Sequence, residues 1–376
     1  MSTAGILADD LTGALDAGVG FCRTFGPVDF VCDPSDAVAG GSLVLSSGSR
    51  DMADENAAVK ATLEQFGMLA GRDIAFKKVD SLMRGHVVAE VAAIMRHSGF
   101  DHCLFAPAFP AQGRVTVAGR QWLRESDGRL AVLGPDLASA FTAAGFETAV
   151  VSVEADWLPE HATIWIGDAA DDADLKALAA RAAGRGRILY CGTAGLAHAQ
   201  GGGAPSWPLP LPPPVLAVVG SPHPITRRQV AGLLNGAEPA AISSHIVARA
   251  GQATLEAVDI GRRVRLLLPA LPHDCATTDA AGWVGRLLAT HLPTTSPVGT
   301  LLVTGGETLA QTVGAIGARR LRLHGEVEAG LPVSRIAGGP WDGRLLVSKS
   351  GAFGDEDTLA RLVGPGAEEA DWRRRG

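Results

Sequence analysis

Short apolar segments that alternate with helix-like segments along the whole chain are the feature that most restricts its fold. Ten such segments are candidate strands, and they cover residues 5–8, 43–46, 74–76, 103–106, 163–166, 188–191, 216–219, 266–268, 301–303 and 345–347. Brief apolar strands separated by helices are typical of mostly parallel sheets that helices cover on both faces. The chain is therefore predicted to belong to the α/β class.

A glycine-rich and proline-rich stretch divides this alternation into two halves. Residues 201–214 read GGGAPSWPLPLPPP, and neither a helix nor a central strand continues through such a sequence. With 376 residues, the chain is also longer than one hydrophobic core usually serves. We therefore expect two α/β domains, residues 1–207 and residues 208–376, with an active-site cleft between them.

Composition and charge exclude several classes of protein. The chain has 47% hydrophobic and 19% charged residues, which is a globular composition, and its net charge of −7 argues against nucleic acid as the main partner. No apolar run approaches the ~20 residues of a membrane span, and no signal peptide precedes the first strand. The five scattered cysteines form no CxxC pair and are typical of reduced thiols. We expect a cytoplasmic protein that does not bind a membrane.

Charged and hydroxyl side chains gather where the strands of the first half end, the place where open α/β sheets bind ligands. Asp9 and Asp10 follow the first strand, Arg50 the second and residues 77–84 the third, while a proline-containing loop adds Arg114. One of the two adjacent acids could cap the helix that follows. Carboxylates also grip hydroxyl groups or bind Mg²⁺, and arginine binds carboxylates through two parallel hydrogen bonds. This half of the chain suits a small, polyhydroxylated anion such as a sugar acid.

Glycine-containing turns follow three strands of the second half, at residues 220–226, 304–308 and 348–355. Glycine lets backbone amides approach a ligand closely, and helix N-termini favour phosphate groups. Three such turns in one domain indicate a nucleotide site. The sequence contains no GxxxxGK[ST], which excludes a P-loop enzyme, and no GxGxxG opens a helix after a strand, which argues against a dinucleotide site.

Taken in order, these turns resemble the four-carbon acid sugar kinase family. The matching segments run over nearly the whole chain and are residues 8–14, 78–85, 107–114, 220–229, 305–308 and 349–354. The resemblance implies an N-terminal domain for the acid sugar, a C-terminal domain for ATP, use of Mg²⁺ and a homodimer. It also implies phosphorylation of the terminal hydroxyl of threonate, erythronate or 3-oxo-tetronate, and all three stay open as substrates.

The resemblance further implies roles for individual residues. Those expected to bind the acid sugar are Asp9, Asp10, Arg50, Lys78, Asp80, Ser81 and Arg114. Those expected to bind ATP are Ser221, Gly305, Gly306, Glu307, Thr308 and Gly351. Asp80 is the candidate for orienting the attacking hydroxyl or accepting its proton, and Arg84 or Arg114 for offsetting charge on the transferring phosphoryl group. The metal ligands stay open.

Two alternative functions come from different classes of protein. The family segment Asp-Ser-Thr-Leu-Arg-Gly-Asn has Leu82, Met83 and His86 in place of its threonine, leucine and asparagine. These changes motivate a sensor that binds sugar acids without turnover. An NAD(P)-dependent oxidoreductase on the same architecture is the second alternative, and the missing dinucleotide fingerprint argues against it.

Overall fold

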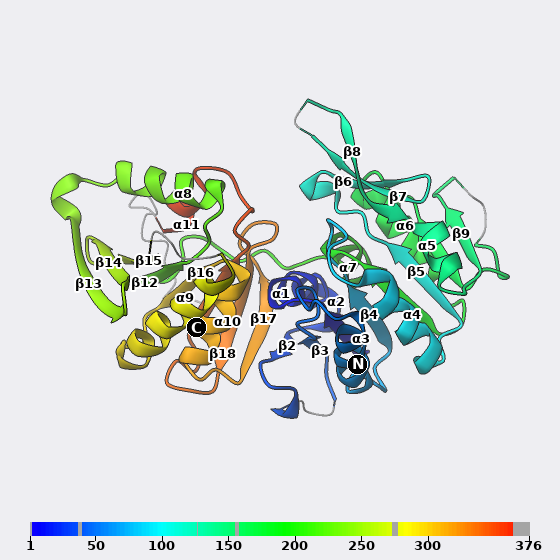
Figure 1. Cartoon of the computed structure of the whole chain (residues 1–376), viewed down its shortest axis with the longest axis horizontal. Coiled ribbons are helices and arrows are strands. Elements are labelled where there is room, and N and C mark those ends of the chain that lie inside the picture. The colour runs from blue at the N-terminus through cyan, green and yellow to red at the C-terminus, as the bar shows by residue number, and fades with distance from the viewer. Residues whose placement is uncertain (1, 37–39, 126, 155–157, 273–276, 364–376) are drawn as a thin grey trace. The chain divides into compact units, whose positions relative to one another are not determined.

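The chain folds as two compact units, Met1–Pro205 and Ser206–Gly376 (Figure 1). The computed structural model describes residues 2–36, 40–125, 127–154, 158–272 and 277–363. The division between the units falls within residues 201–214, the stretch on which the sequence analysis places the domain boundary.

The N-terminal unit is built on a parallel sheet. In the described part of the unit this sheet has the strand order β2–β3–β1–β4–β11–β5–β10–β9, and its strand pairs are parallel. The strands are β1 (Ala4–Ala8), β2 (Val28–Val31), β3 (Leu43–Ser46), β4 (Ile74–Lys78), β5 (His102–Ala106), β9 (Thr148–Val151), β10 (Ile164–Gly167) and β11 (Ile188–Gly192). Because all these strands run in one direction, their carboxyl ends meet at one edge of the sheet.

Two groups of helices cover this sheet. In one group α7 contacts both α1 and α6, and in the other α4 contacts both α3 and α5. The helices are α1 (Leu11–Gly20), α2 (Cys22–Phe25), α3 (Glu55–Gly67), α4 (Val87–Ser98), α5 (Leu137–Ala143), α6 (Asp172–Ala182) and α7 (Ala194–Gly201). Strands buried on both faces need apolar side chains at nearly every position, and β1, β10 and β11 are buried along their whole length.

A small antiparallel sheet extends the N-terminal unit and was not predicted from the sequence. It consists of β6 (Arg114–Val117), β7 (Arg120–Arg124) and β8 (Leu130–Asp136), in that order. It follows directly on the loop of residues 107–114, so a segment predicted to shape a ligand site is held by strands on one side.

The C-terminal unit has a parallel centre and antiparallel margins. Its described strands follow the order β13–β14–β15–β12–β16–β19–β18–β17. The pairs β15–β12, β12–β16 and β16–β19 are parallel, and the pairs towards both margins are antiparallel. The α/β class is confirmed, although the sheet of this unit is mixed.

Figure 1 labels the helices of the C-terminal unit and its strands other than β19. The strands are β12 (Val215–Val219), β13 (Ile242–Ala250), β14 (Ala253–Ile260), β15 (Val264–Ala270), β16 (Thr300–Thr304), β17 (Arg320–Glu326), β18 (Pro332–Ala337) and β19 (Leu345–Lys349). The helices are α8 (Pro224–Asn235), α9 (Thr277–His291), α10 (Gly306–Ala315) and α11 (Thr358–Val363).

The second part of the proline-rich stretch packs on the C-terminal unit and is not a free linker. Leu211 is buried in the core of that unit. The carbonyl oxygen of Pro214 accepts hydrogen bonds from the amides of Gly299 and Thr300, at 3.0 and 3.1 Å. The hydroxyl of Thr300 donates to the carbonyl oxygen of Pro212 at 2.8 Å. The sequence prediction of a linker over 201–214 is therefore wrong for residues 211–214.

The sequence analysis expected reduced thiols and no membrane span, and the structure can be compared with both expectations. Cys22, Cys32, Cys103 and Cys191 form no disulfide within the described ranges, and Cys275 lies outside them. Burial raises the pKa of Cys22 and of Cys32 to about 12, which makes both thiols poor nucleophiles. No helix in the described ranges is long and apolar enough to cross a membrane.

Lys77 and Glu90 form a buried ion pair. We expect the loss of one partner to lower the free energy of unfolding. The two charged groups are 2.6 Å apart, with side chains 0% and 2% exposed. Lys77→Met should lower the free energy of unfolding by about 3–5 kcal/mol, because it leaves the Glu90 charge buried without its partner. The double variant Lys77→Met/Glu90→Leu should recover most of that loss.

Urea unfolding measures this prediction. The control is Lys60→Met, which breaks the Lys60–Glu64 pair on the surface of α3, where the side chains are 76% and 64% exposed. Exposed pairs contribute little, so this variant should unfold like the wild type. Equal stability of Lys77→Met and Lys60→Met would contradict the prediction.

Candidate active site

Asp10 begins helix α1, and its side chain is the helix cap. The residue is extended, with φ −144° and ψ 164°, and its Oδ1 accepts the amide hydrogen of Gly13 at 2.8 Å. The hydroxyl of Thr12 donates to Oδ2 at 2.6 Å. One of the two adjacent acids therefore satisfies the free amides of a helix N-terminus, as the sequence analysis considered.

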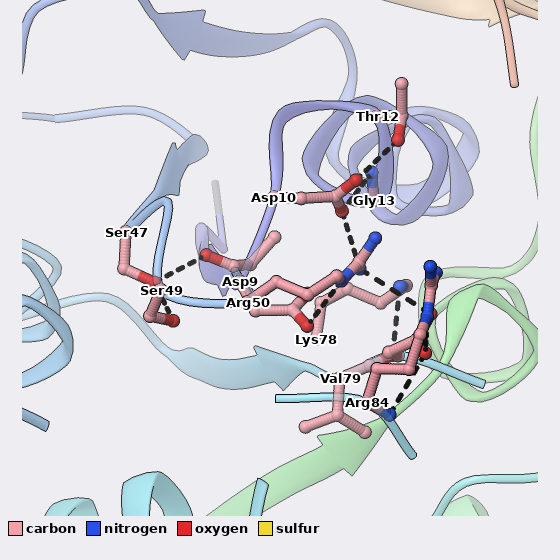
Figure 2. A network of polar contacts seen from close by, with 12 residues as sticks. Asp9, Asp10, Thr12, Gly13, Ser47, Ser49, Arg50, Lys78, Val79 and Arg84 are labelled. Atoms are coloured by element: carbon pink, nitrogen blue, oxygen red, sulfur yellow. Dashed lines mark hydrogen bonds and ion pairs between the residues drawn. The ribbon is translucent and has the colours of Figure 1, made fainter. Parts of the chain in front are cut away.

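Arg50 lies beside Asp9 and Asp10, the two carboxylates that follow β1 (Figure 2). Its Nε and Nη2 donate to the two oxygens of Asp9, at 3.0 and 2.8 Å. Nη2 is also 2.7 Å from Oδ1 of Asp10 and 3.8 Å from Oδ1 of Asp80. The sequence analysis expected this guanidinium to bind a substrate carboxylate with both prongs. Two of its nitrogens instead bind the protein's own carboxylates, and within the described ranges Nη1 has no hydrogen-bond partner.

The neighbouring positive charges keep Asp9 and Asp80 ionised. Burial raises the pKa of Asp9, but the charges of Arg50 and Lys78 outweigh burial, and the pKa lies below its usual value. Burial also raises the pKa of Asp80, but hydrogen bonds from Arg84 and the charges of Arg50 and Arg84 lower it to about 2. Both groups are therefore carboxylates at neutral pH.

Asp80 is held by Arg84 as well as by the Arg50 charge. Oδ2 of Asp80 accepts from the backbone amide and from Nε of Arg84, at 3.1 and 2.7 Å, and Oδ1 accepts from Nη2 at 3.0 Å. Asp80 is 5% exposed, whereas the Arg84 side chain is 58% exposed. The carboxylate is thus fixed in orientation, while its arginine partner remains accessible.

Lys78 lies against the first turn of α1. Its ammonium donates to the carbonyl oxygen of Val79 at 2.9 Å and is buried. A Cβ placed on Gly13 would be 2.9 Å from this ammonium and 2.4 Å from Oδ1 of Asp10. Glycine at position 13 therefore leaves room for the cation beside the cap. We call Arg50, the carboxylates Asp9, Asp10 and Asp80, and the neighbouring cations Lys78 and Arg84 the Arg50 cluster.

Arg114 and Ser81 lie at the margin of the cluster, and Gln121 connects their segments. Nη1 of Arg114 donates to the carbonyl oxygen of Gln112 at 2.7 Å. Burial lowers the pKa of Arg114, while the charge of Asp80 raises it. The buried Gln121 amide donates to the carbonyl oxygens of Pro107 and Ser81, at 2.8 and 3.3 Å. Sequence reasoning missed Gln121, because it lies on β7 of the small sheet and no motif marks it.

The residues that depart from the family segment make contacts within the protein. A Cβ on Gly134 of β8 would be 3.0 Å from Cβ of Met83, so Met83 packs against the small sheet. A ring nitrogen of His86 is 2.8 Å from the carbonyl oxygen of Met52. Neither residue displaces Asp9, Asp10 or Asp80 from the Arg50 cluster.

Three turns of the C-terminal unit meet around Ser221. A Cβ on Gly351 would be 2.0 Å from Oγ of Ser221, and a Cβ on Gly220 would be 2.1 Å from Oγ1 of Thr308. A Cβ on Gly305 would be 3.3 Å from Cβ of Ser221. The turns after β12, β16 and β19 therefore approach so closely that side chains would separate them. We call this group of turns the glycine cradle.

Gly306 and Glu307, also expected at ATP, begin α10 beside the cradle. Glu307 is exposed, and its carboxylate accepts a hydrogen bond from Gln311 at 3.1 Å. Backbone amides at a helix N-terminus attract phosphate. These two residues therefore border the cradle and do not form its closest contacts.

Buried polar side chains hold the turn after β19, residues 350–355, through its carbonyl oxygens. The Lys349 ammonium donates to the carbonyl oxygens of Ser350 and Phe353, at 3.0 and 2.9 Å, and the residue is 0% exposed. The hydroxyl of Thr226 donates to the carbonyl oxygen of Gly351 at 2.8 Å. The Gln229 amide donates to the carbonyl oxygen of Asp355 at 2.6 Å. These bonds hold Gly351 against Ser221.

The described residues contain no group of three or more His, Cys, Asp or Glu side chains placed to hold a metal ion. Asp9, Asp10 and Asp80 are all engaged by arginine. Mg²⁺ that arrives with a nucleotide needs only one or two carboxylates, because phosphate and water oxygens complete its shell. The described carboxylates are therefore not arranged as a site for a resident ion.

Comparison with known proteins identifies both units. Residues 4–134 match the model of a sugar-binding N-terminal domain family, and residues 216–359 match that of a nucleotide-binding C-terminal domain family. A D-threonate kinase of Cupriavidus necator is 33% identical, over 94% of this chain and 95% of its own length. The chain belongs to the four-carbon acid sugar kinase family.

Other relatives agree with this membership. A 3-oxo-tetronate kinase of Pseudomonas fluorescens is 27% identical over 96% of both chains. A solved structure from Haemophilus influenzae has a TM-score of 0.67 and 18% identity, and covers 95% of this chain and 98% of its own. At that identity the structure supports the fold alone.

The buried Lys349 should make the free energy of unfolding depend on pH. Burial lowers its pKa from 10.5 to about 8. Between these values the unfolded chain keeps a proton that the folded chain has released, so the free energy of unfolding rises with pH. Relative to Lys349→Met, which lacks the proton, the wild type should gain up to ~1.4 kcal/mol per pH unit in this window.

Urea unfolding of both proteins between about pH 7.5 and about pH 9.5 checks the sign. Taking the difference between the two proteins removes the contributions of other titrating groups. A difference that stays constant, or falls as the pH rises, would show that the ammonium is not desolvated in the fold.

Proposed function

We propose that this protein is an ATP-dependent kinase that phosphorylates the terminal hydroxyl of a four-carbon acid sugar, with D-threonate as the first candidate. The carrying observation is the Arg50 cluster, in which ionised carboxylates, Lys78 and Arg84 lie together at the carboxyl ends of β1, β3 and β4. Such a set suits a ligand that has both hydroxyl groups and a negative charge. The similarity to D-threonate kinases supports the choice of acid.

The cations would bind the carboxylate of the acid sugar. Nη1 of Arg50 points away from the bonds to Asp9. Within the described ranges the Lys78 ammonium donates one hydrogen bond, to Val79, of the three that it can donate. The remaining donors would hold a carboxylate by charge-assisted hydrogen bonds. Asp9 and Asp10 would accept hydrogen bonds from the hydroxyl groups of the substrate.

Asp80 would orient the attacking hydroxyl. With a pKa of about 2, it is a weak base, so holding the hydroxyl in line contributes more than removing its proton. Phosphoryl transfer depends mainly on positioning and on stabilising charge. The exposed Arg84, with Arg114 behind it, would stabilise negative charge on the transferring group.

The glycine cradle would hold the nucleotide. Ser221, Gly305 to Thr308 and Gly351 would bind the phosphates through backbone amides and hydroxyls. When bound, ATP with Mg²⁺ supplies the phosphoryl group and part of the counter-charge. Gly351 would need its contact with Ser221 for this, and Lys349 would keep the turn in place.

Release of ADP from ATP and Mg²⁺ tests the proposal. The acids to compare are D- and L-threonate, D- and L-erythronate and their 3-oxo forms. Turnover with one of them would establish the kinase and identify its substrate. Acid-sugar binding without ADP release would favour the sensor, although Met83 and His86, two of the three residues that motivate it, leave the carboxylates in place.

Asp80→Asn tests the role of the orienting carboxylate. We expect kcat to fall by about 100-fold or more, because the amide offers the hydroxyl a different hydrogen-bond pattern. The affinity for the acid should change far less. Asp172→Asn, on the exposed first turn of α6, is the matched control and should keep full activity. A near-normal kcat for Asp80→Asn would remove Asp80 from this role.

Gly351→Ala tests the cradle. The added Cβ would meet Ser221 Oγ at 2.0 Å and push the two turns apart, so ATP affinity measured by calorimetry should fall at least tenfold. Gly314→Ala on α10 is the control, because its Cβ would meet nothing within 4 Å. Equal ATP affinity of the two variants would place the nucleotide elsewhere.

A further inference from the structure

A cavity lies in the C-terminal unit at the amino ends of its parallel strands. Its volume is about 670 Å³. The start of β12, the β14–β15 turn and the segment after α9 form its walls. The glycine cradle follows the opposite, carboxyl end of β12. The five residues of β12 span roughly 13 Å, so the two places are separate.

Two arginines give this cavity a positive charge. Arg262 and Arg263 lie side by side in the β14–β15 turn, are exposed, and have no carboxylate partner within the part of the chain that the structure describes. A third arginine, Arg265, is paired with Asp259 through bonds of 2.6 and 3.1 Å, so that pair adds no net charge. The site therefore carries two uncompensated guanidinium groups.

His291, the histidine among the described lining residues, does not account for this charge. Burial lowers the pKa of His291, and the charges of Arg265 and His245 lower it further. Its imidazole is therefore neutral at pH 7, and the positive charge comes from the two arginines.

Hydroxyl groups complete the lining. Ser243 and Ser296 line the cavity, and neither hydroxyl has a hydrogen-bond partner among the described residues. The hydroxyls of Thr294 and Thr295 already donate to the carbonyl oxygen of His291, at 2.8 and 3.0 Å. Two guanidinium forks and two free hydroxyl donors together match an oxyanion with several acceptor oxygens.

The walls of the cavity are fixed to one another by the backbone. The amide of Val215 donates to the carbonyl oxygen of Arg263 at 2.7 Å, which ties the arginine turn to β12. The amide of Gly299 donates to the carbonyl oxygen of Pro214 at 3.0 Å, which ties the opposite wall to the same strand. The backbone that carries the donors is thus fixed, while their side chains keep their freedom.

We propose that this cavity is a binding site for a small phosphate-bearing anion, separate from the nucleotide cradle. Arginine forks bind phosphate through two parallel hydrogen bonds, and two neighbouring forks suit a ligand with two or more negative charges. The volume is that of a small-molecule site. The inference uses only residues outside the proposed active site, so it stands or falls independently of the kinase activity.

Calorimetric titration of the full chain with pyrophosphate, in the absence of Mg²⁺, tests this site. Arg262→Gln/Arg263→Gln should weaken binding at least tenfold, as expected when charge-assisted hydrogen bonds are lost. The control Arg249→Gln/Arg335→Gln removes the same charge from exposed positions of the same unit outside the cavity and should leave the affinity unchanged. Gly351→Ala should also keep this binding, because it alters only the cradle.

The proposal would be overturned if Gly351→Ala lost pyrophosphate binding while Arg262→Gln/Arg263→Gln kept it. A wild type that does not bind pyrophosphate would also overturn it. An equal loss in both arginine variants would reduce the effect to general charge and also overturn it. If the double variant fails to fold, Arg262→Gln and Arg263→Gln singly should each weaken binding severalfold.

Discussion

The Arg50 guanidinium, shared by three carboxylates, is the interaction on which the N-terminal site depends. Asp9 and Asp80 are 3% and 5% exposed, and carboxylates so buried need an opposite charge to remain ionised. Arg50 provides it for Asp9 and Asp10 directly, and Arg84 adds to it for Asp80. As a result, Nη1 is the one nitrogen of this guanidinium that has no hydrogen-bond partner among the described residues.

The nucleotide-binding unit uses a different constraint. Its turns come together because glycine leaves no Cβ where Gly220 and Gly351 meet Thr308 and Ser221. A buried lysine, Lys349, then fixes the last turn through two carbonyl oxygens. The first unit matches a sugar-binding domain family and the second a nucleotide-binding one. The two units differ accordingly in make-up, since charged side chains gather in the first and closely packed backbone turns in the second.

Much of the fold and the candidate site could be predicted from the sequence, because parallel strands bring chain-distant residues to one edge. Asp9, Arg50 and Asp80 each follow an apolar strand, and they meet in the structure. Strands β6, β7 and β8 were missed, because half-exposed antiparallel strands lack a continuous apolar run. The hydrogen-bond partner of Arg50 could not be predicted either, because nothing in the sequence shows that its guanidinium binds the carboxylate of Asp9.

The most direct test of this account is the structure of the protein with D-threonate and a non-hydrolysable ATP analogue. We expect the acid's carboxylate within hydrogen-bond distance of Arg50 Nη1 and Lys78 Nζ, and its terminal hydroxyl at Asp80. Asp9 should keep both hydrogen bonds from Arg50. D-threonate bound away from these residues, or Arg50 released from Asp9 to bind the acid with both prongs, would contradict the account.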